Sequence, residues 1–297
     1  SLLMTENSLL HESWKHAVLI VGALIVIFPF YSMLSYSMKS PSEIMTNKGG
    51  FFGSQEKFRD DYCIKLGNEP KDCLVTPIIY NYTEAFKKAP LLRYLLNGVI
   101  VTVSIFFIQV LIALPCAYAL SKLRWWGREF VFGMVLFCLL IPVHAIALPL
   151  YLMLSKAGLT NTYSALVIPW TISVFGIFLM RQFFKTVPDD LVDAARMDGM
   201  TEFGIIWKVM LPTAIPALLA FAIFSVVAHW NDYFWPRIVI TGNRDLFTPP
   251  LGIREFRGGI DSDEFGPMMA SIVTVTVPLI VAFIIAQKRF VEGITMT

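Results

Sequence analysis

The chain has 297 residues, of which 56% are hydrophobic and only 15% are charged, and its formal net charge at pH 7 is +2. With a mean hydropathy of +0.64, it has too few polar residues to cover a soluble domain of this size, so lipid is the expected solvent. The Lys and Arg residues are dispersed rather than gathered in a basic block, which argues against nucleic acid as a partner.

Long apolar runs divide the chain. A bilayer core about 30 Å thick needs about 20 apolar residues per helix. Six runs approach this length and predict an all-α integral membrane protein with six transmembrane helices; the runs are 17–38, 95–120, 130–155, 163–180, 214–240 and 267–287. The third run is the clearest, because it contains no charged side chain. The polar segment 1–12 and the lack of a small-residue cleavage site after the first run favour a retained first span.

Proline occurs inside several of these runs. Each proline removes a backbone donor and favours a bend, so we expect kinked helices, although packing alone accounts for many prolines in spans. The residues concerned are Pro29, Pro115, Pro142, Pro149 and Pro169.

Short loops indicate the orientation of the spans. The loop after the second run carries Lys122, Arg124 and Arg128, whereas the loop after the third has a single basic residue, so the former is expected in the cytoplasm. Both termini then lie in the cytoplasm as well. The stretch 39–93 lies outside, and its length and turn-forming composition predict a small folded cap.

The four cysteines fall into two environments. Cys116 and Cys138 lie inside apolar runs and are expected to pack as small apolar side chains. Cys63 and Cys73 lie in the polar outer stretch, and no pair has CxxC spacing. In an oxidising compartment these two would form a disulfide that closes a loop of about ten residues.

The most informative stretch, 185–212, reads KTVPDDLVDAARMDGMTEFGIIWKVMLP and lies between the fourth and fifth runs. Thr186 followed by Asp189 resembles a capping box, so a helix is expected to start here. Gly199 suits the left-handed position that ends a helix, and Thr201 can cap a second helix. The stretch therefore predicts two helices joined at a glycine.

On the first of these helices, Leu191, Ala194 and Ala195 would form a narrow face of small residues that a partner backbone could approach closely. Acidic residues and Arg196 would occupy the rest of its surface. On physical grounds alone, an amphipathic helix at the lipid interface is an equally good interpretation.

Three groups of residues in this stretch have a specific spacing: Asp193-Ala194-Ala195, Asp198-Gly199 and Leu211-Pro212. The pattern resembles the EAA loop of permeases in binding-protein-dependent ABC importers. It departs from the family by Asp193 in place of the usual Glu, which shortens the reach of the charge, and by Met200 where Ala is frequent. The likeness covers most of the chain and is closest to the shorter permease of the maltose-type carbohydrate group. Further stretches that carry it are Pro29-Phe30 through Lys39, Asn97-Gly98, Trp230-Asn231-Asp232 and 289–295.

The resemblance implies a type I ABC importer permease fold in which the first helix of this loop is the coupling helix and lies in a cleft of an ATPase. The coupling contact would then be made by Asp193, Ala194, Ala195, Asp198, Gly199, Leu211 and Pro212. The implied partners are a second homologous permease, an ATPase homodimer that uses ATP and Mg, and a periplasmic substrate-binding protein, all at a bacterial inner membrane. The permease itself binds no cofactor, and the substrate would be a sugar, oligosaccharide, polyol or sugar-like phosphate.

With this resemblance, 1–14 is expected to be a cytoplasmic N-terminal segment and 15–94 the first transmembrane helix with a periplasmic loop. Residues 95–288 would form a core five-helix permease domain that includes the coupling loop 185–212, and 289–297 a cytoplasmic tail.

Two other classes of protein share some of these sequence features. A membrane enzyme is disfavoured because the sequence lacks HExxH, GxSxG and any clustered His/Cys ligand set, so no catalytic or metal-binding residue is assigned. The sequence also lacks a Walker-type Gly-rich loop, so ATP hydrolysis is expected in a partner. A channel without ATP coupling would share the composition, and co-purification with an ATPase would separate it from an importer.

The transport path is expected near the end of the fifth run, at Trp230, Asn231, Asp232 and Tyr233, with Asn97 as a further candidate. Polar groups in a span are costly unless they face water or a partner, and aromatic faces beside polar groups suit sugars. The alternative is an aromatic belt at the outer interface. For His144, a packing role is the better interpretation.

The outer loop 241–266 is rich in turn formers and mixed in charge, which suits a transient protein contact. Similar permeases use this position to reach into the binding protein, and a solvated connector is the alternative. The residues expected to make this contact are Leu251, Gly252, Ile253, Arg254, Arg257, Gly258 and Gly259.

Overall fold

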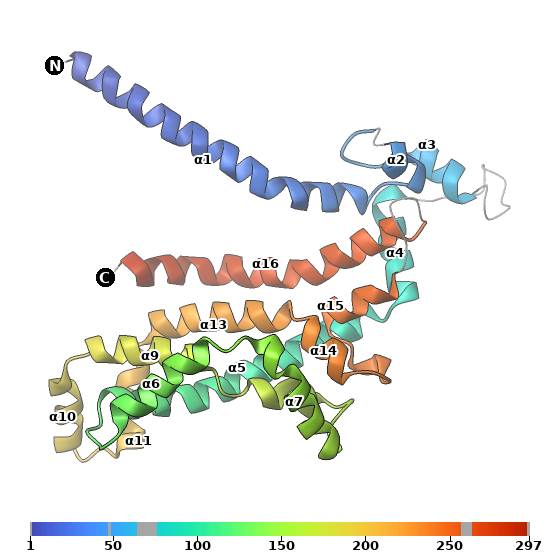
Figure 1. The fold of residues 1–297 in the computed structure, drawn as a ribbon. Coiled ribbons are helices and arrows are strands. Elements are labelled where there is room, and N and C mark those ends of the chain that lie inside the picture. Colours follow the sequence, from blue (N-terminus) through green and yellow to red (C-terminus); the bar gives the residue numbers. More distant parts are fainter. Residues whose placement is uncertain (1, 47–48, 64–75, 257–262, 296–297) are drawn as a thin grey trace. The chain divides into compact units, whose positions relative to one another are not determined.

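A computed structural model gives the fold of the chain, and the structure describes residues 2–46, 49–63, 76–256 and 263–295. Every regular element in these ranges is helical (Figure 1). Three single helices are long and apolar enough to cross a membrane: Ser13–Tyr36, Leu91–Ser121 and Phe265–Gln287. Three bent helix pairs bring the number of possible spans to six, in agreement with the sequence prediction.

The third span is bent, as the prolines in its sequence predicted. It consists of α6 (Arg128–Leu139) and α7 (Val143–Lys156), which meet at an angle of 99°. Pro142 lies at the junction in an extended conformation. A proline lacks the backbone N–H that a continuous helix needs, so the helix ends just before it.

The fourth and fifth spans are also bent. The fourth joins α8 (Tyr163–Val167) and η2 (Ile168–Trp170) to α9 (Val174–Thr186) at 40°. The fifth span follows α11 (Glu202–Ile205), η3 (Ile206–Met210) and α12 (Leu211–Thr213), and an 85° bend separates these from α13 (Ile215–Trp230). The predicted run reached Ile240, but α13 ends at Trp230, and α14 (Phe234–Val239) is a separate helix.

The chain forms two compact units, one made of Ser1–Pro90 with Ile253–Thr276, and the other of Leu91–Gly252 with Val277–Thr297. The first unit contains α1 (Leu2–Tyr36), whose apolar window has no buried residue, and the beginning of α16 (Phe265–Thr295). Its outer part holds four short elements: α2 (Pro41–Thr46), α3 (Gln55–Phe58), η1 (Arg59–Cys63) and α4 (Pro77–Lys88).

The outer part of this first unit has a small core of its own. Asn81 on α4 is fully buried, and its side-chain amide donates to the carbonyls of Ser37 and Lys39, each at 3.0 Å. The Glu43 carboxylate is also buried and accepts from the backbone N–H of Ser54 at 3.0 Å. Since these residues lie far apart in sequence, the stretch is a folded cap, as predicted.

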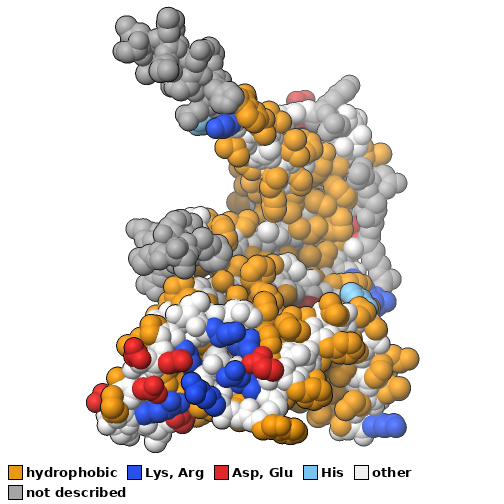
Figure 2. Space-filling view, turned by 60° about the vertical axis from the view of Figure 1, so that its left-hand side comes forward, with side chains coloured by type: hydrophobic (Ala, Val, Ile, Leu, Met, Phe, Trp, Pro, Cys, Tyr) orange, Lys and Arg blue, Asp and Glu red, His pale blue; other side chains and the backbone are white. Residues whose placement is uncertain are grey.

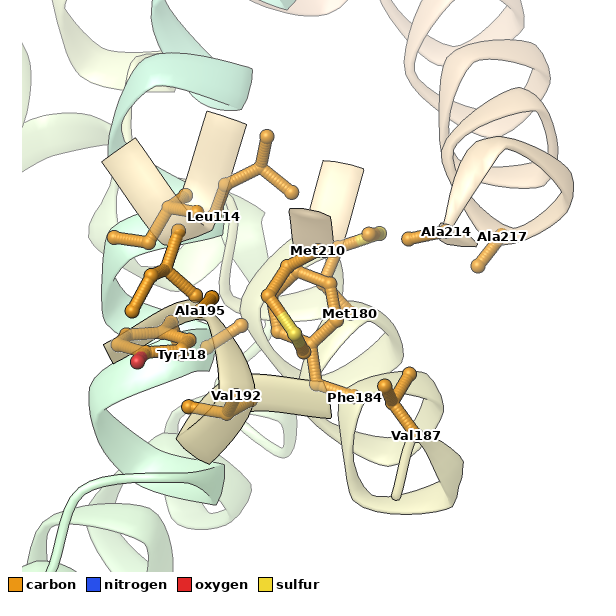
Figure 3. Close-up of a cluster of buried hydrophobic side chains, with 13 residues drawn as sticks. Leu114, Tyr118, Met180, Phe184, Val187, Val192, Ala195, Met210, Ala214 and Ala217 are labelled. Carbon is orange, nitrogen blue, oxygen red and sulfur yellow. The ribbon is translucent and has the colours of Figure 1, made fainter. Parts of the chain in front are cut away.

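The second unit is built around α5 (Leu91–Ser121), which packs most extensively against α9 and α13. At the crossing of α9 and α13, a Cβ on Gly176 would lie 2.3 Å from the Phe221 ring, so only glycine permits this approach. A further cluster of buried side chains joins α5, α9 and the segment 187–217 (Figure 3).

The cysteines were only partly predicted. Cys116 is half-buried, but Cys138 is exposed on α6, so the expectation that both pack inside was wrong for Cys138. Cys138 lies in an apolar span, where a small apolar side chain can face lipid as well as protein. Cys63 is buried and takes part in a disulfide. Cys73 lies outside the described residues, so the pairing of these two remains a prediction.

Candidate coupling surface and transport path

The surface helix α10 (Asp189–Met197) begins where the sequence predicted, but not through a capping box. The Thr186 hydroxyl donates to the Phe183 carbonyl at 2.7 Å, and the residue preceding the helix, Pro188, makes no side-chain cap. Asp189 instead pairs with the Lys122 ammonium at 2.5 Å, and this hydrogen bond holds the pKa of the Asp189 carboxyl below its ordinary value. The capping box was therefore wrong, because Thr186 belongs to the last turn of α9 and the residue that precedes α10 is a proline without a side-chain acceptor.

The end of α10 follows the prediction. Gly199 has a φ of +78°, its N–H donates to the Arg196 carbonyl, and the N–H of Met200 donates to the Ala195 carbonyl, both at 3.0 Å. These two bonds form the Schellman motif that glycine favours. The Thr201 hydroxyl then accepts from the Gly204 N–H at 3.1 Å and caps α11. The chain thus leaves α10 in a fixed direction.

The predicted small-residue face of α10 is divided in two. Ala195 and Val192 are buried against Tyr118 of α5 and Phe184 of α9 (Figure 3), whereas Ala194 and Leu191 are exposed. Asp193 and Asp198 are exposed as well. The exposed surface of α10 and α11 also carries several large apolar side chains: Leu191 (46% exposed), Met197 (84%), Met200 (38%) and Phe203 (64%). The predicted Leu211 is partly buried, and Pro212 is exposed.

Lys, Arg, Asp and Glu side chains gather on one part of the molecular surface (Figure 2), and several of them belong to α10 and its neighbours. Arg196 contacts the Asp193 carboxylate at 2.9 Å and the Glu202 carboxylate at 2.8 Å. Lys122, Arg124, Asp189, Asp193 and Arg196, with Leu123 and Val192, line a hollow beside α10. The combination of exposed apolar side chains and a polar rim is typical of a protein-binding surface.

A second group of polar residues, which was not predicted from the sequence, lies deep in the helical bundle. The Gln109 amide of α5 donates to the Trp170 carbonyl at 2.7 Å and accepts from the Ser225 hydroxyl at 2.6 Å. Its nitrogen also lies 3.3 Å from the His229 imidazole of α13. Gln109 and Ser225 are both buried. The signals in the sequence were a single glutamine and a single histidine, Gln109 and His229, each inside an apolar run.

This polar group opens into a hollow between aromatic side chains. The lining combines hydrogen-bonding groups with three phenylalanine rings and consists of Gln109, Ser173, Phe175, Phe221, Phe224, Ser225, Ala228 and His229. Phe175 and Phe224 contact each other edge to face at 5.3 Å. Few polar groups set among aromatic walls are characteristic of small-molecule sites.

The path residues predicted from the sequence differ in burial and in hydrogen bonding. Asn97 is fully buried, donates to the carbonyls of Asp245 and Phe247, and accepts from the Tyr163 hydroxyl at 2.6 Å, so its hydrogen-bonding groups are used in packing. Trp230 is buried. The remaining candidates, Asn231, Asp232 and Tyr233, directly follow the end of α13.

Asn231 is exposed and donates to the Val227 carbonyl one turn earlier. The Asp232 carboxylate accepts from the Trp235 N–H at 3.2 Å and so holds the start of α14, while Tyr233 is 42% exposed. His144 packs on the Phe234 ring at 4.4 Å. Asn231 and Asp232 thus each make a side-chain hydrogen bond to the backbone of a nearby residue.

The outer loop residues are also divided. Leu251 is fully buried, and Gly252 packs so closely on Tyr94 that a Cβ would lie 2.1 Å from the ring. Ile253 and Arg254 are half-exposed. The other three predicted contacts, Arg257, Gly258 and Gly259, lie outside the described residues.

Comparisons with known proteins identify the class to which this fold and these surfaces belong. Residues 88–295 match the family described as "Binding-protein-dependent transport system inner membrane component", so the chain belongs to this family of importer permeases. The chain is 32% identical to the arabinooligosaccharides transport system permease protein AraQ of Halalkalibacterium halodurans, over 92% of this chain and 91% of AraQ. It is 29% identical to the diacetylchitobiose uptake system permease protein NgcG of Streptomyces coelicolor, over 95% of this chain and 86% of NgcG.

The fold has a solved counterpart. A chain of a bacterial ABC transporter involved in the import of the acidic polysaccharide alginate superposes with a TM-score of 0.73, over 93% of this chain and 95% of that chain, at 24% identity. The type I permease fold expected from the sequence is therefore confirmed, and the chain is a multi-pass transport subunit.

Proposed function

We propose that this chain is one of two permease subunits of an ABC importer for a carbohydrate, and that α10 with its exit couples it to a separate ATPase. The observation that carries the proposal is the outer surface of α10 and α11, where Leu191, Met197 and Phe203 are exposed on a segment whose backbone is fixed by caps at its exit. Exposed apolar side chains of this size favour a partner. The named relatives, which transport an arabinooligosaccharide and diacetylchitobiose, support a sugar as the substrate.

The proposed role also implies the other subunits of the transporter. The ATPase would use ATP and Mg, a second permease would complete the path, and a periplasmic binding protein would deliver the substrate. Both termini and the 122–128 loop would face the cytoplasm, since that loop is basic and lies beside α10 through the Lys122–Asp189 pair. On the outer side, contact with the binding protein would fall to Ile253, Arg254 and the following residues, because Leu251 and Gly252 are buried.

Two substitutions at Gly199 test the coupling role. Because nothing lies within 4 Å of a Cβ at this position, a substitution acts only through the positive φ. Valine resists that conformation at a cost of about 1–2 kcal/mol, whereas asparagine tolerates it. Gly199→Val should lower ATP-driven uptake and co-purification with the ATPase, and Gly199→Asn should retain both. Normal uptake by Gly199→Val would contradict the proposal, and uptake by this chain without any ATPase would favour a channel.

The substrate path is proposed to pass the hollow around Gln109, Ser225 and His229, which offers hydrogen-bonding groups and aromatic faces to sugar hydroxyls and ring carbons. Phe224→Ala removes one aromatic wall at a side chain that is 60% exposed, so little stability should be lost. We expect a clear fall in sugar uptake with normal assembly. Phe137→Ala, at a 66% exposed phenylalanine of α6, is the matched control. If both variants import sugar at the wild-type rate, the hollow is not part of the path.

A further inference from the structure

Three polar side chains connect the coupling segment to the central helix α5. The Tyr118 hydroxyl on α5 hydrogen-bonds to the Glu202 carboxylate, which begins α11. The same carboxylate accepts from Arg196 of α10, with Nε at 2.8 Å and Nη2 at 3.2 Å. Arg196 Nη2 also lies 3.5 Å from the Tyr118 hydroxyl. We call these three residues the Tyr118–Glu202–Arg196 network.

The network is the polar contact between α10 and the body of α5, while the Lys122–Asp189 pair joins α10 to the residue that follows α5. Val192 and Ala195 touch α5 through apolar surfaces, which attract without fixing a direction. Hydrogen bonds to charged groups are stronger and directional, so they resist displacement of one helix along another. Tyr118 is 1% exposed, whereas the Arg196 and Glu202 side chains are 36% and 46% exposed, so only the tyrosine end of the network is shielded from competing water. A movement of α10 would thus be passed to α5 by these bonds.

The helix that receives this movement also carries the polar group in the bundle. Gln109 precedes Tyr118 by nine residues on α5, a separation of about 14 Å along the helix at a rise of 1.5 Å per residue. Through its amide, Gln109 contacts Trp170, Ser225 and His229. A shift of α5 would therefore alter the hydrogen bonds in the hollow.

We propose that the Tyr118–Glu202–Arg196 network transmits ATPase-driven movement of α10 to α5 and so to the hollow around Gln109. The inference rests on the proposed function and assigns to these three residues a role in coupling rather than in binding the ATPase. Tyr118 and Glu202 act through Arg196 and are positioning residues.

Tyr118→Phe is the sharpest test, since it removes one oxygen and keeps the ring in its cluster. The readout is the number of sugar molecules imported per ATP hydrolysed by the reconstituted transporter. We expect binding-protein-stimulated ATP hydrolysis to persist while this ratio falls roughly tenfold, the factor equivalent to about 1.4 kcal/mol and within the range for a hydrogen bond to a charged group. Glu202→Gln should lower the ratio as well, and the double variant should be little worse than the worse single one, as expected for one shared interaction.

Tyr163→Phe is the matched control, because it removes a comparable, partly buried hydroxyl bond to α5, the 2.6 Å bond to Asn97, at a site away from α10. Its import ratio should stay near that of the wild type. A wild-type ratio in Tyr118→Phe would overturn the network, as would an equal fall in both tyrosine variants, since that would indicate general destabilisation. If the wild-type chain shows no ATP-driven import with its ATPase, the proposed function fails instead, and the two failures are distinguishable.

Discussion

The surface segment α10–α11 and the buried group around Gln109 belong to the same compact unit but are stabilised by different forces. The surface segment depends on its own backbone, through the Gly199 turn and the Thr201 cap, and its outer side chains are exposed. The buried group depends on hydrogen bonds among side chains and carbonyls from three separate elements. An exposed side chain of the surface segment can therefore be substituted with little effect on the stability of the fold. A substitution in the buried group, in contrast, removes hydrogen bonds between helices and should destabilise the bundle.

The largest effect should come from filling the helix crossing beside the buried group. Gly176→Val would place a side chain against the Phe221 ring, since even a Cβ would lie 2.3 Å from it. Overpacking typically costs about 1–3 kcal/mol and occasionally more. We expect a lower thermal unfolding midpoint in detergent and reduced yield. Gly133→Val on α6, where nothing lies within 4 Å of a Cβ, should behave like the wild type, and equal losses in both variants would show that the crossing is not special.

A somewhat smaller loss is expected for Gln109→Leu, which keeps the volume of the side chain but removes its amide. The Trp170 carbonyl and the Ser225 hydroxyl would each lose a partner, at about 1–3 kcal/mol for a buried polar group left unpaired. Thermal unfolding should report this change. Adding Ser225→Ala to Gln109→Leu should cost less than the two single losses together, because the variants share one bond. Full additivity would mean that the group is not a connected network.

These two regions also differ in what could be predicted from the sequence. The turn at Gly199 and the cap at Thr201 are local, so residue type and spacing were sufficient. The Thr186 capping box failed because α9 continues through Thr186, whose hydroxyl donates to the Phe183 carbonyl. Gln109 was missed because its partners come from other helices, and a single glutamine in an apolar run does not identify them. The six spans followed from composition and a bend at Pro142 from its residue type, whereas the angle of 99° could not be predicted from the sequence.

Loss of the Thr201 cap should have a smaller, local effect. Thr201→Ala removes the acceptor for the Gly204 N–H, a change that typically costs about 1 kcal/mol. Amide hydrogen exchange should become faster at the start of α11 while the midpoint of global unfolding changes little. Thr213→Ala is a suitable control because the Thr213 hydroxyl only donates to the Met210 carbonyl within its own turn. If exchange accelerates throughout the bundle, the surface segment is not independent of the buried group.

The smallest effect concerns the pH dependence of the Lys122–Asp189 pair. Because the pKa of Asp189 is lowered in the folded chain, the pair contributes stability above the ordinary carboxyl pKa of about 4, and this contribution is lost as the pH falls through the lower folded value. Asp189 is 72% exposed, so solvent screens the pair and the contribution is small. Hydrogen exchange in the first turn of α10 should be constant between about pH 5 and 8, once corrected for intrinsic rates, and should accelerate below about pH 4.

In Asp189→Asn the corrected exchange should be faster at neutral pH and should lack the acid-dependent step. Asp190→Asn, next to it in the same turn, is the control and should retain the step, since Lys122 contacts Asp189. An acid-dependent step that survives in Asp189→Asn would show that another carboxylate stabilises the start of α10. The contact between α10 and the end of α5 would then not depend on the Lys122–Asp189 ion pair.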